Sequence, residues 1–121
     1  MTLKECYAAL GGDYEDVVSR LRSERLVQKF ALKFLEDGSY DLLCTSMENG
    51  AQEDAFRAAH TIKGICQNLN FTRLGESSSE MTEALRAGDL EKAKVLFPKL
   101  SADYQCTVDA IKAYQAALPQ A

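Results

Sequence analysis

Apolar residues recur along this chain every three or four positions, the spacing of one face of an α-helix. No stretch alternates between apolar and polar residues at the period of a β-strand. A capping box from Thr2 to Glu5 opens the first helical stretch, and turn signals separate the later ones. These signals are Gly11–Gly12, Asp37–Gly38, Asn49–Gly50 and Gly88.

The pattern predicts an all-α protein. Short connections favour antiparallel neighbours, so we expect an up-and-down four-helix bundle with short extra N-terminal helices. Pro98 lies within the last apolar stripe and is expected to kink or split that helix. The tail, residues 116–121, is expected to fray. An earlier inward-facing stripe is predicted at Val27, Phe30, Ala31, Phe34 and Leu35.

Length and charge exclude several classes of protein. The 121 residues fit a single domain, 1–121, and the net charge of −4 argues against a nucleic-acid surface. No apolar run approaches the roughly 20 residues of a membrane span, and the N-terminus lacks the order of a signal peptide. We therefore expect a cytoplasmic monomer without membrane contact. The Met start and short tail lean slightly toward a free-standing protein, with a domain of a larger protein as the alternative.

The cysteines are widely spaced, without a C-x-x-C motif. With no export signal, we expect small core residues in a reducing cytosol rather than disulfides. No Cys/His cluster has the ligand spacing of a metal site, so no bound metal is expected. The cysteines are Cys6, Cys44, Cys66 and Cys106.

The chain has one histidine, His60, in a predicted helix from about Ala51 to Asn70. It is rotated about 160° from Ile62, which lies on that helix's apolar stripe, so the imidazole is expected to face solvent. The stripe comprises Ala55, Ala59, Ile62, Cys66 and Leu69. The opposite face comprises Phe56, His60, Lys63, Gly64 and Gln67.

This exposed face suits phosphoryl chemistry. A neutral imidazole is a good nucleophile near neutral pH, and Lys63 lies one helical turn from His60. Gly64 lacks a side chain beside the imidazole, although a mid-helix glycine costs about 0.5–1 kcal/mol relative to alanine. Close approach of a partner would explain why that residue is glycine.

The segment His60-Thr61-Ile62-Lys63-Gly64, with Leu69 and Leu74 downstream, resembles the signature of histidine-containing phosphotransfer (HPt) domains. The resemblance extends roughly from Gly12 to Ala116. HPt domains carry phosphoryl groups between receiver domains in multistep phosphorelays, and the fold that the resemblance implies is the same helical bundle.

The resemblance implies that His60 accepts a phosphoryl group from a receiver aspartate and passes it to another receiver. Lys63 would stabilise the phosphoryl charge, and Gly64, Gln67 and Phe56 would contact the partner. Alternatively, Phe56 packs beneath the N-terminal helices. The chain would need no cofactor, because Mg²⁺ would come from the partner's carboxylates, and it would have no autonomous kinase activity.

Two residues depart from the family pattern. Asn70 replaces a frequent glycine, but asparagine enters the left-handed conformation readily. Thr82 stands where some members place Gln or Glu near the imidazole. Because threonine is shorter, we expect the imidazole to be oriented by Thr82 or Ser79, to be oriented through water, or to be less constrained.

Two other interpretations remain. An enzyme using His60 as a general base would need a nearby nucleophile or an orienting carboxylate, which the exposed face lacks, and no Gly-rich phosphate loop is present. A degenerate HPt domain would be a helical interaction module without phosphorylation.

Overall fold

The computed structural model describes residues 1–119, which form seven α-helices and no strand. This confirms the predicted all-α class. The expectation for Gln120 and Ala121 lies outside the described residues. The helices are α1 (Leu3–Leu10), α2 (Tyr14–Leu21), α3 (Glu24–Phe34), α4 (Ser39–Glu48), α5 (Gln52–Leu69), α6 (Thr72–Arg86) and α7 (Leu90–Ala116).

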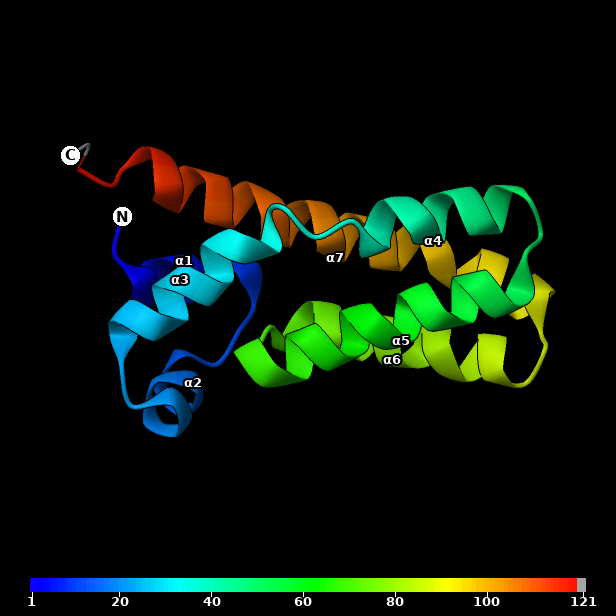
Figure 1. The fold of residues 1–121 in the computed structure, drawn as a ribbon, viewed down its shortest axis with the longest axis horizontal. Coiled ribbons are helices and arrows are strands. Elements are labelled where there is room, and N and C mark those ends of the chain that lie inside the picture. The colour runs from blue at the N-terminus through cyan, green and yellow to red at the C-terminus, as the bar shows by residue number, and fades with distance from the viewer. Residues whose placement is uncertain (120–121) are drawn as a thin grey trace.

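Helices α4 to α7 form the four-helix bundle. Figure 1 shows α4 and α7 along one side and α5 and α6 along the other, with successive helices antiparallel. The short helices α1, α2 and α3 gather at the end of the bundle where α5 and α7 terminate. The predicted architecture is therefore confirmed, and one end of α5 lies beside the N-terminal helices.

Local sequence signals account for the first helices. The Thr2 hydroxyl accepts from the Glu5 backbone N–H at 3.1 Å, and the Glu5 carboxylate accepts from the Thr2 N–H at 2.8 Å. Gly11 ends α1 in the left-handed conformation, with φ 77°. The Asp13 side chain then caps α2 by accepting from the Asp16 N–H at 3.0 Å.

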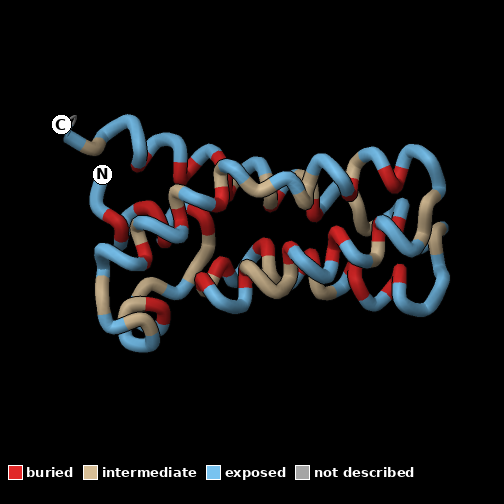
Figure 2. Tube along the Cα trace, in the orientation of Figure 1, coloured by how far each residue is buried: buried red, intermediate tan, exposed pale blue. Residues whose placement is uncertain are grey.

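The core is continuous from the bundle to the N-terminal helices, and Figure 2 shows buried residues where helices face one another. Phe71, between α5 and α6, links the two regions. Its ring centroid lies 5.6 Å from that of Tyr7 on α1 and 5.4 Å from that of Phe34 on α3. Such aromatic contacts hold the N-terminal helices against the end of α5.

The prediction that Phe30 faces inward is wrong, and of the two outcomes predicted at Pro98, a kink or a split, the split does not occur. Phe30 is 40% exposed, whereas Val27 and Phe34 of the same helix are buried. Pro98 lies inside α7 without splitting it. Because Pro98 is exposed, the backbone carbonyl that its ring leaves without a helical partner can be hydrated.

All four cysteines are free thiols, but only Cys6 and Cys66 are buried as predicted; Cys44 and Cys106 are half-buried. Burial raises the pKa of the Cys6 thiol to about 11 and that of the Cys66 thiol to about 12. Both therefore behave as small core residues. Across residues 1–119, none of the helices combines the length and apolar character needed to span a bilayer.

Candidate functional site

The histidine helix α5 is held by one buried face. Its predicted apolar stripe is confirmed: every member is at most 6% exposed. This face packs between α4 and α6, so the helix is a rigid support for whatever its other face carries. The buried stripe residues are Ala55, Ala59, Ile62, Cys66 and Leu69.

His60 lies in the middle of this 18-residue helix, and its side chain is exposed as predicted. One aromatic neighbour contacts it. The Phe56 ring, one turn earlier, is stacked on the imidazole with a centroid distance of 5.7 Å and an interplanar angle of 21°. The Arg86 guanidinium, from the end of α6, lies over the Phe56 ring at 5.0 Å from its centroid. Phe56 therefore does not pack beneath the N-terminal helices; it lies between α5 and α6.

Lys63 and Gly64 lie one turn beyond the histidine. Lys63 is half-buried, and its ammonium forms no ion pair within residues 1–119, so its charge is available to an anion. A Cβ atom built on Gly64 would meet no atom within 4 Å apart from the adjoining backbone of its own helix. Gly64 therefore faces open space rather than a tightly packed helix. Gln67 continues this surface and is exposed.

Thr82 does not orient the imidazole. Its side chain is fully buried, and its hydroxyl donates to the Ser78 backbone carbonyl at 2.6 Å. The expectation for Thr82 is wrong because residues 78, 82 and 85 share the inward face of α6, and a threonine there bonds its own helix. Ser79 is half-buried, and no hydrogen bond joins it to the imidazole within the described chain. Its role stays a prediction.

The C-terminal end of α5 is fastened by the N-terminal helices. Asn70 ends the helix in the left-handed conformation, with φ 55°, as its substitution for glycine allows. The Tyr7 hydroxyl donates to the Leu69 carbonyl at 2.8 Å, and the Arg20 guanidinium donates to the Asn68 carbonyl at 2.8 Å. A cation at this position also complements the negative end of the helix dipole.

A carboxylate completes this cap. Asp16 accepts hydrogen bonds from the Asn70 side-chain amide at 2.8 Å and from the Arg20 guanidinium at 3.0 Å. The hydrogen bond from Asn70 and that from Arg20 lower the pKa of the Asp16 carboxyl below its ordinary value. The Asp16–Arg20–Asn70 cluster thus orders the loop that follows the histidine helix.

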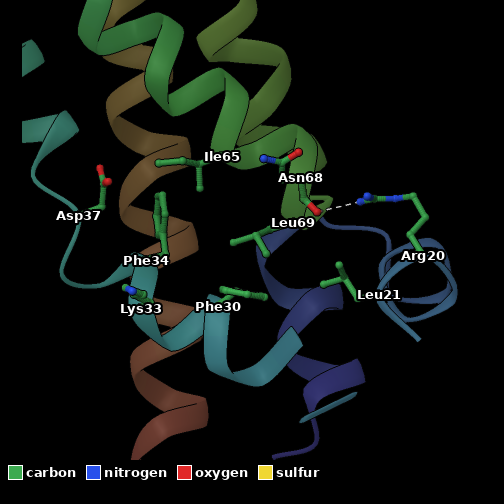
Figure 3. A pocket seen from close by; sticks show the side chains of 9 residues that line it. All are labelled: Arg20, Leu21, Phe30, Lys33, Phe34, Asp37, Ile65, Asn68 and Leu69. Carbon is green, nitrogen blue, oxygen red and sulfur yellow. Dashed lines mark hydrogen bonds between the residues drawn. The ribbon is translucent and has the colours of Figure 1, made fainter. Parts of the chain in front are cut away.

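Beside this end of α5 lies a pocket of about 450 Å³ that sequence reasoning missed. Figure 3 shows side chains of α2, α3 and α5 converging on it, with Phe30 and Leu21 on one side and Ile65 on the other. Lys33, Arg20 and Asp37 stand on its border. The pocket is therefore mainly apolar, with two cations and a carboxylate at its rim.

A sequence signal for this pocket was present. Val27, Ala31 and Phe34 already form a complete stripe at i, i+4 and i+7, so α3 needs no further core residue. Phe30 lies one position before Ala31, off this stripe, and is 40% exposed. An apolar surface beyond what one stripe can bury indicates contact with something else.

The site thus combines an exposed imidazole, an uncompensated cation and open space above a glycine. Carboxylates, which a divalent cation prefers, are not gathered here: residues 1–119 hold no group of three or more His, Cys, Asp or Glu side chains that could bind a metal ion. The arrangement is suited to transferring a group between His60 and a second molecule, because a bulky partner can reach the imidazole.

Comparison with known proteins identifies a family but no individual relative. No curated protein and no solved structure shows a significant match to the chain. The family model described as Hpt domain matches residues 14–118, nearly the whole sequence, including the histidine helix and the pocket beside it. The chain therefore belongs to the Hpt domain family.

Proposed function

We propose that this protein is a histidine phosphocarrier of a cytoplasmic multistep phosphorelay. His60 accepts a phosphoryl group from a receiver-domain aspartate and passes it to the aspartate of another receiver. The observation that carries this proposal is the exposed His60 in mid-helix, with the unpaired Lys63 and the open space at Gly64 beside it. Histidine phosphotransfer is the activity that membership of the Hpt family implies.

The transfer needs little covalent machinery from the protein. A lone pair on one imidazole nitrogen of His60 attacks the phosphorus of the aspartyl phosphate, and the N–P bond forms as the P–O bond breaks. The aspartate leaves as a carboxylate with that electron pair. Attack by the carboxylate of a second receiver reverses these steps and restores the neutral imidazole. Catalysis then depends on positioning and on charge stabilisation.

Lys63 supplies the charge stabilisation in this proposal. Three residues along a helix correspond to an axial rise of about 4.5 Å, so its ammonium can reach the equatorial oxygens of a phosphoryl group on His60. The Mg²⁺ that phosphoryl transfer uses would be held by the receiver's carboxylates. The chain itself would need no cofactor and would not act as a kinase.

Receiver docking would extend from Gly64 and Gln67 to the pocket. Asn68, at the pocket's edge, is eight residues from His60, an axial distance of about 12 Å and a rotation of about 80°. A typical protein interface covers about 800 Å² on each partner, which corresponds to a radius of about 16 Å. A receiver centred on His60 would therefore reach Asn68 at the edge of the pocket, and Phe30, which also lines the pocket, would offer an apolar contact.

The direct experiment incubates the protein with a panel of receiver domains labelled on aspartate with radioactive phosphate. Label should move to this chain and resist alkali but not acid, the behaviour of phosphohistidine rather than of an acyl phosphate. His60→Gln should accept no label, whereas Arg57→Gln, an exposed change on the same helix, should accept it normally.

Circular dichroism should show the same helix content and melting behaviour in both variants, because both positions are exposed. Label that still reaches the His60→Gln variant would refute the assigned nucleophile. A folded parent protein that takes no label from any receiver would favour the interaction module without phosphorylation.

A further inference from the structure

The imidazole of His60 stacks on the aromatic ring of Phe56 and has no hydrogen-bond partner in the described part of the chain. No hydrogen bond to either ring nitrogen is formed within residues 1–119, and Thr82 is committed to the Ser78 carbonyl. An exposed side chain without partners moves between rotamers on a picosecond to nanosecond scale. The neighbour that His60 does have is the stacked Phe56 ring, with a centroid distance of 5.7 Å and an interplanar angle of 21°.

Phe56 is itself restrained. It is half-buried and packs against the hydrophobic core, so its ring belongs partly to the interior. The Arg86 guanidinium lies over it at 5.0 Å, a cation–π contact. Arg86 in turn pairs with Glu83 at 3.4 Å, one turn earlier on α6. Contacts from the neighbouring helix thus converge on the ring that supports the nucleophile.

We propose that Phe56 is a positioning residue for His60, and that Arg86 supports it from α6. The inference rests on the proposed function, because it concerns how the imidazole is presented to an aspartyl phosphate. Stacking uses the π faces of the two rings and leaves both imidazole nitrogens unbonded. It therefore fixes the ring plane without occupying the in-plane lone pair that attacks phosphorus.

A positioning residue and a docking residue can be told apart by changing the phosphoryl donor. Phosphoramidate is a small donor: the imidazole nitrogen attacks its phosphorus, the P–N bond breaks and ammonia leaves. No protein partner takes part. A positioning residue is needed with either donor, whereas a docking residue is needed only with a receiver.

The experiment measures labelling of His60 by phosphoramidate and by a phosphorylated receiver, in the parent protein and in Phe56→Leu, Phe56→Tyr and Phe97→Leu. Aromatic pairing contributes about 0.5–1.5 kcal/mol, so Phe56→Leu should lower the maximal rate by roughly 2- to 12-fold with both donors, with little change in KM. Phe56→Tyr should retain the parent rate. Phe97→Leu removes a phenylalanine of α7 that stacks on Tyr40 of α4, away from His60, and should also retain the parent rate.

A spectroscopic measurement tests the stack without any activity. The Phe56 ring current should shift the imidazole proton resonances of His60 in the parent protein and in Phe56→Tyr. Phe56→Leu should lose that shift, and Arg86→Met should reduce it. Thermal melts identify any variant that has lost its fold, and Phe56→Tyr then still tests the proposal.

The labelling rates with the two donors and the imidazole resonances together distinguish three cases: Phe56 positions His60, Phe56 contacts the receiver, or the protein is not a phosphocarrier. A Phe56→Leu defect that appears with the receiver and not with phosphoramidate would overturn the proposal and make Phe56 a docking contact. Equal imidazole shifts in the parent and in Phe56→Leu would overturn it as well. If the folded parent protein accepts phosphate from neither donor, the phosphocarrier function itself fails, whatever the spectrum shows.

Discussion

The guanidinium of Arg20 donates to the backbone carbonyl of Asn68 at 2.8 Å and thereby joins α2 to the end of the histidine helix. The last carbonyls of a helix have no partner within it, so this contact satisfies a group that otherwise depends on water. Arg20 is partly exposed, and its ion pair with Asp16 alone would contribute little. Its importance is geometric, because it couples the N-terminal helices to the element that carries His60.

This cap should weaken in acid. Hydrogen bonds from Asn70 and Arg20 lower the pKa of Asp16 in the folded protein, so its contribution to stability is present above the unfolded pKa of about 3.9 and is lost as pH falls through the lower folded pKa. Asp16→Asn should therefore lower the melting temperature near neutral pH, and the difference should shrink below about pH 4. Melts between about pH 2.5 and pH 7 measure it. A difference that is constant across that range would contradict the assignment.

Lys63→Ala should slow transfer by roughly 10- to 100-fold, the effect of removing one electrostatic stabiliser worth about 1.4–2.7 kcal/mol. Stability should hardly change, because Lys63 forms no ion pair in the described chain. Rapid-quench kinetics with a labelled receiver measure the rate, and Lys112→Ala, an exposed lysine on α7, is the control. Equal rates in both variants would make Lys63 an ordinary surface lysine.

Gly64 is the position where stability and function should oppose each other. Gly64→Ala should stabilise the helix by up to about 1 kcal/mol, because the added Cβ meets nothing within 4 Å apart from the adjoining backbone of its own helix. Gly64→Gln should leave the melting temperature unchanged or higher, yet weaken receiver binding and transfer through a clash with the partner. Melts and transfer assays on the same preparations decide it. Loss of stability with full transfer would show that Gly64 serves packing.

Replacing Phe30 should weaken receiver binding without destabilising the fold. Phe30→Ser should raise the KM for a phosphorylated receiver by roughly 5- to 30-fold, the effect of losing an apolar anchor worth about 1–2 kcal/mol. Leu26→Ser is a matched control, because Leu26 is equally exposed, at 40%, on the same helix but does not line the pocket. Equal KM values in the two variants would place the docking surface elsewhere.

The helices and the exposed face of α5 were predictable because each follows from the pattern of a single helix, and the short connections between helices then favour an antiparallel bundle. The apolar stripe from Ala55 to Leu69 determines which side of α5 is buried, and His60 is then exposed by rotation alone. Asn70 could be assigned to a helix end for a similarly local reason, since few residues adopt its positive φ without strain.

Features that depend on two or more helices were not predictable in this way. The Arg86 contact with Phe56 requires the packing of α6 on α5, and the pocket at Phe30 requires three helices to converge. At Thr82, by contrast, the pattern within a single helix was the better guide. A position inferred from family resemblance was overruled by the inward stripe of α6, which the helical spacing of residues 78, 82 and 85 already indicates.

The packing of α1 on α7 has a consequence for how the molecule assembles. The Cys6 thiol donates to the Ala110 carbonyl at 3.5 Å, across a sequence separation of 104 residues. During synthesis, α1 therefore emerges long before the surface that buries it, and closing so long a loop carries an entropic penalty that late contacts must offset. We expect the first helices to dock last, so a nascent chain acquires a rigid end for its histidine helix only after α7 has formed.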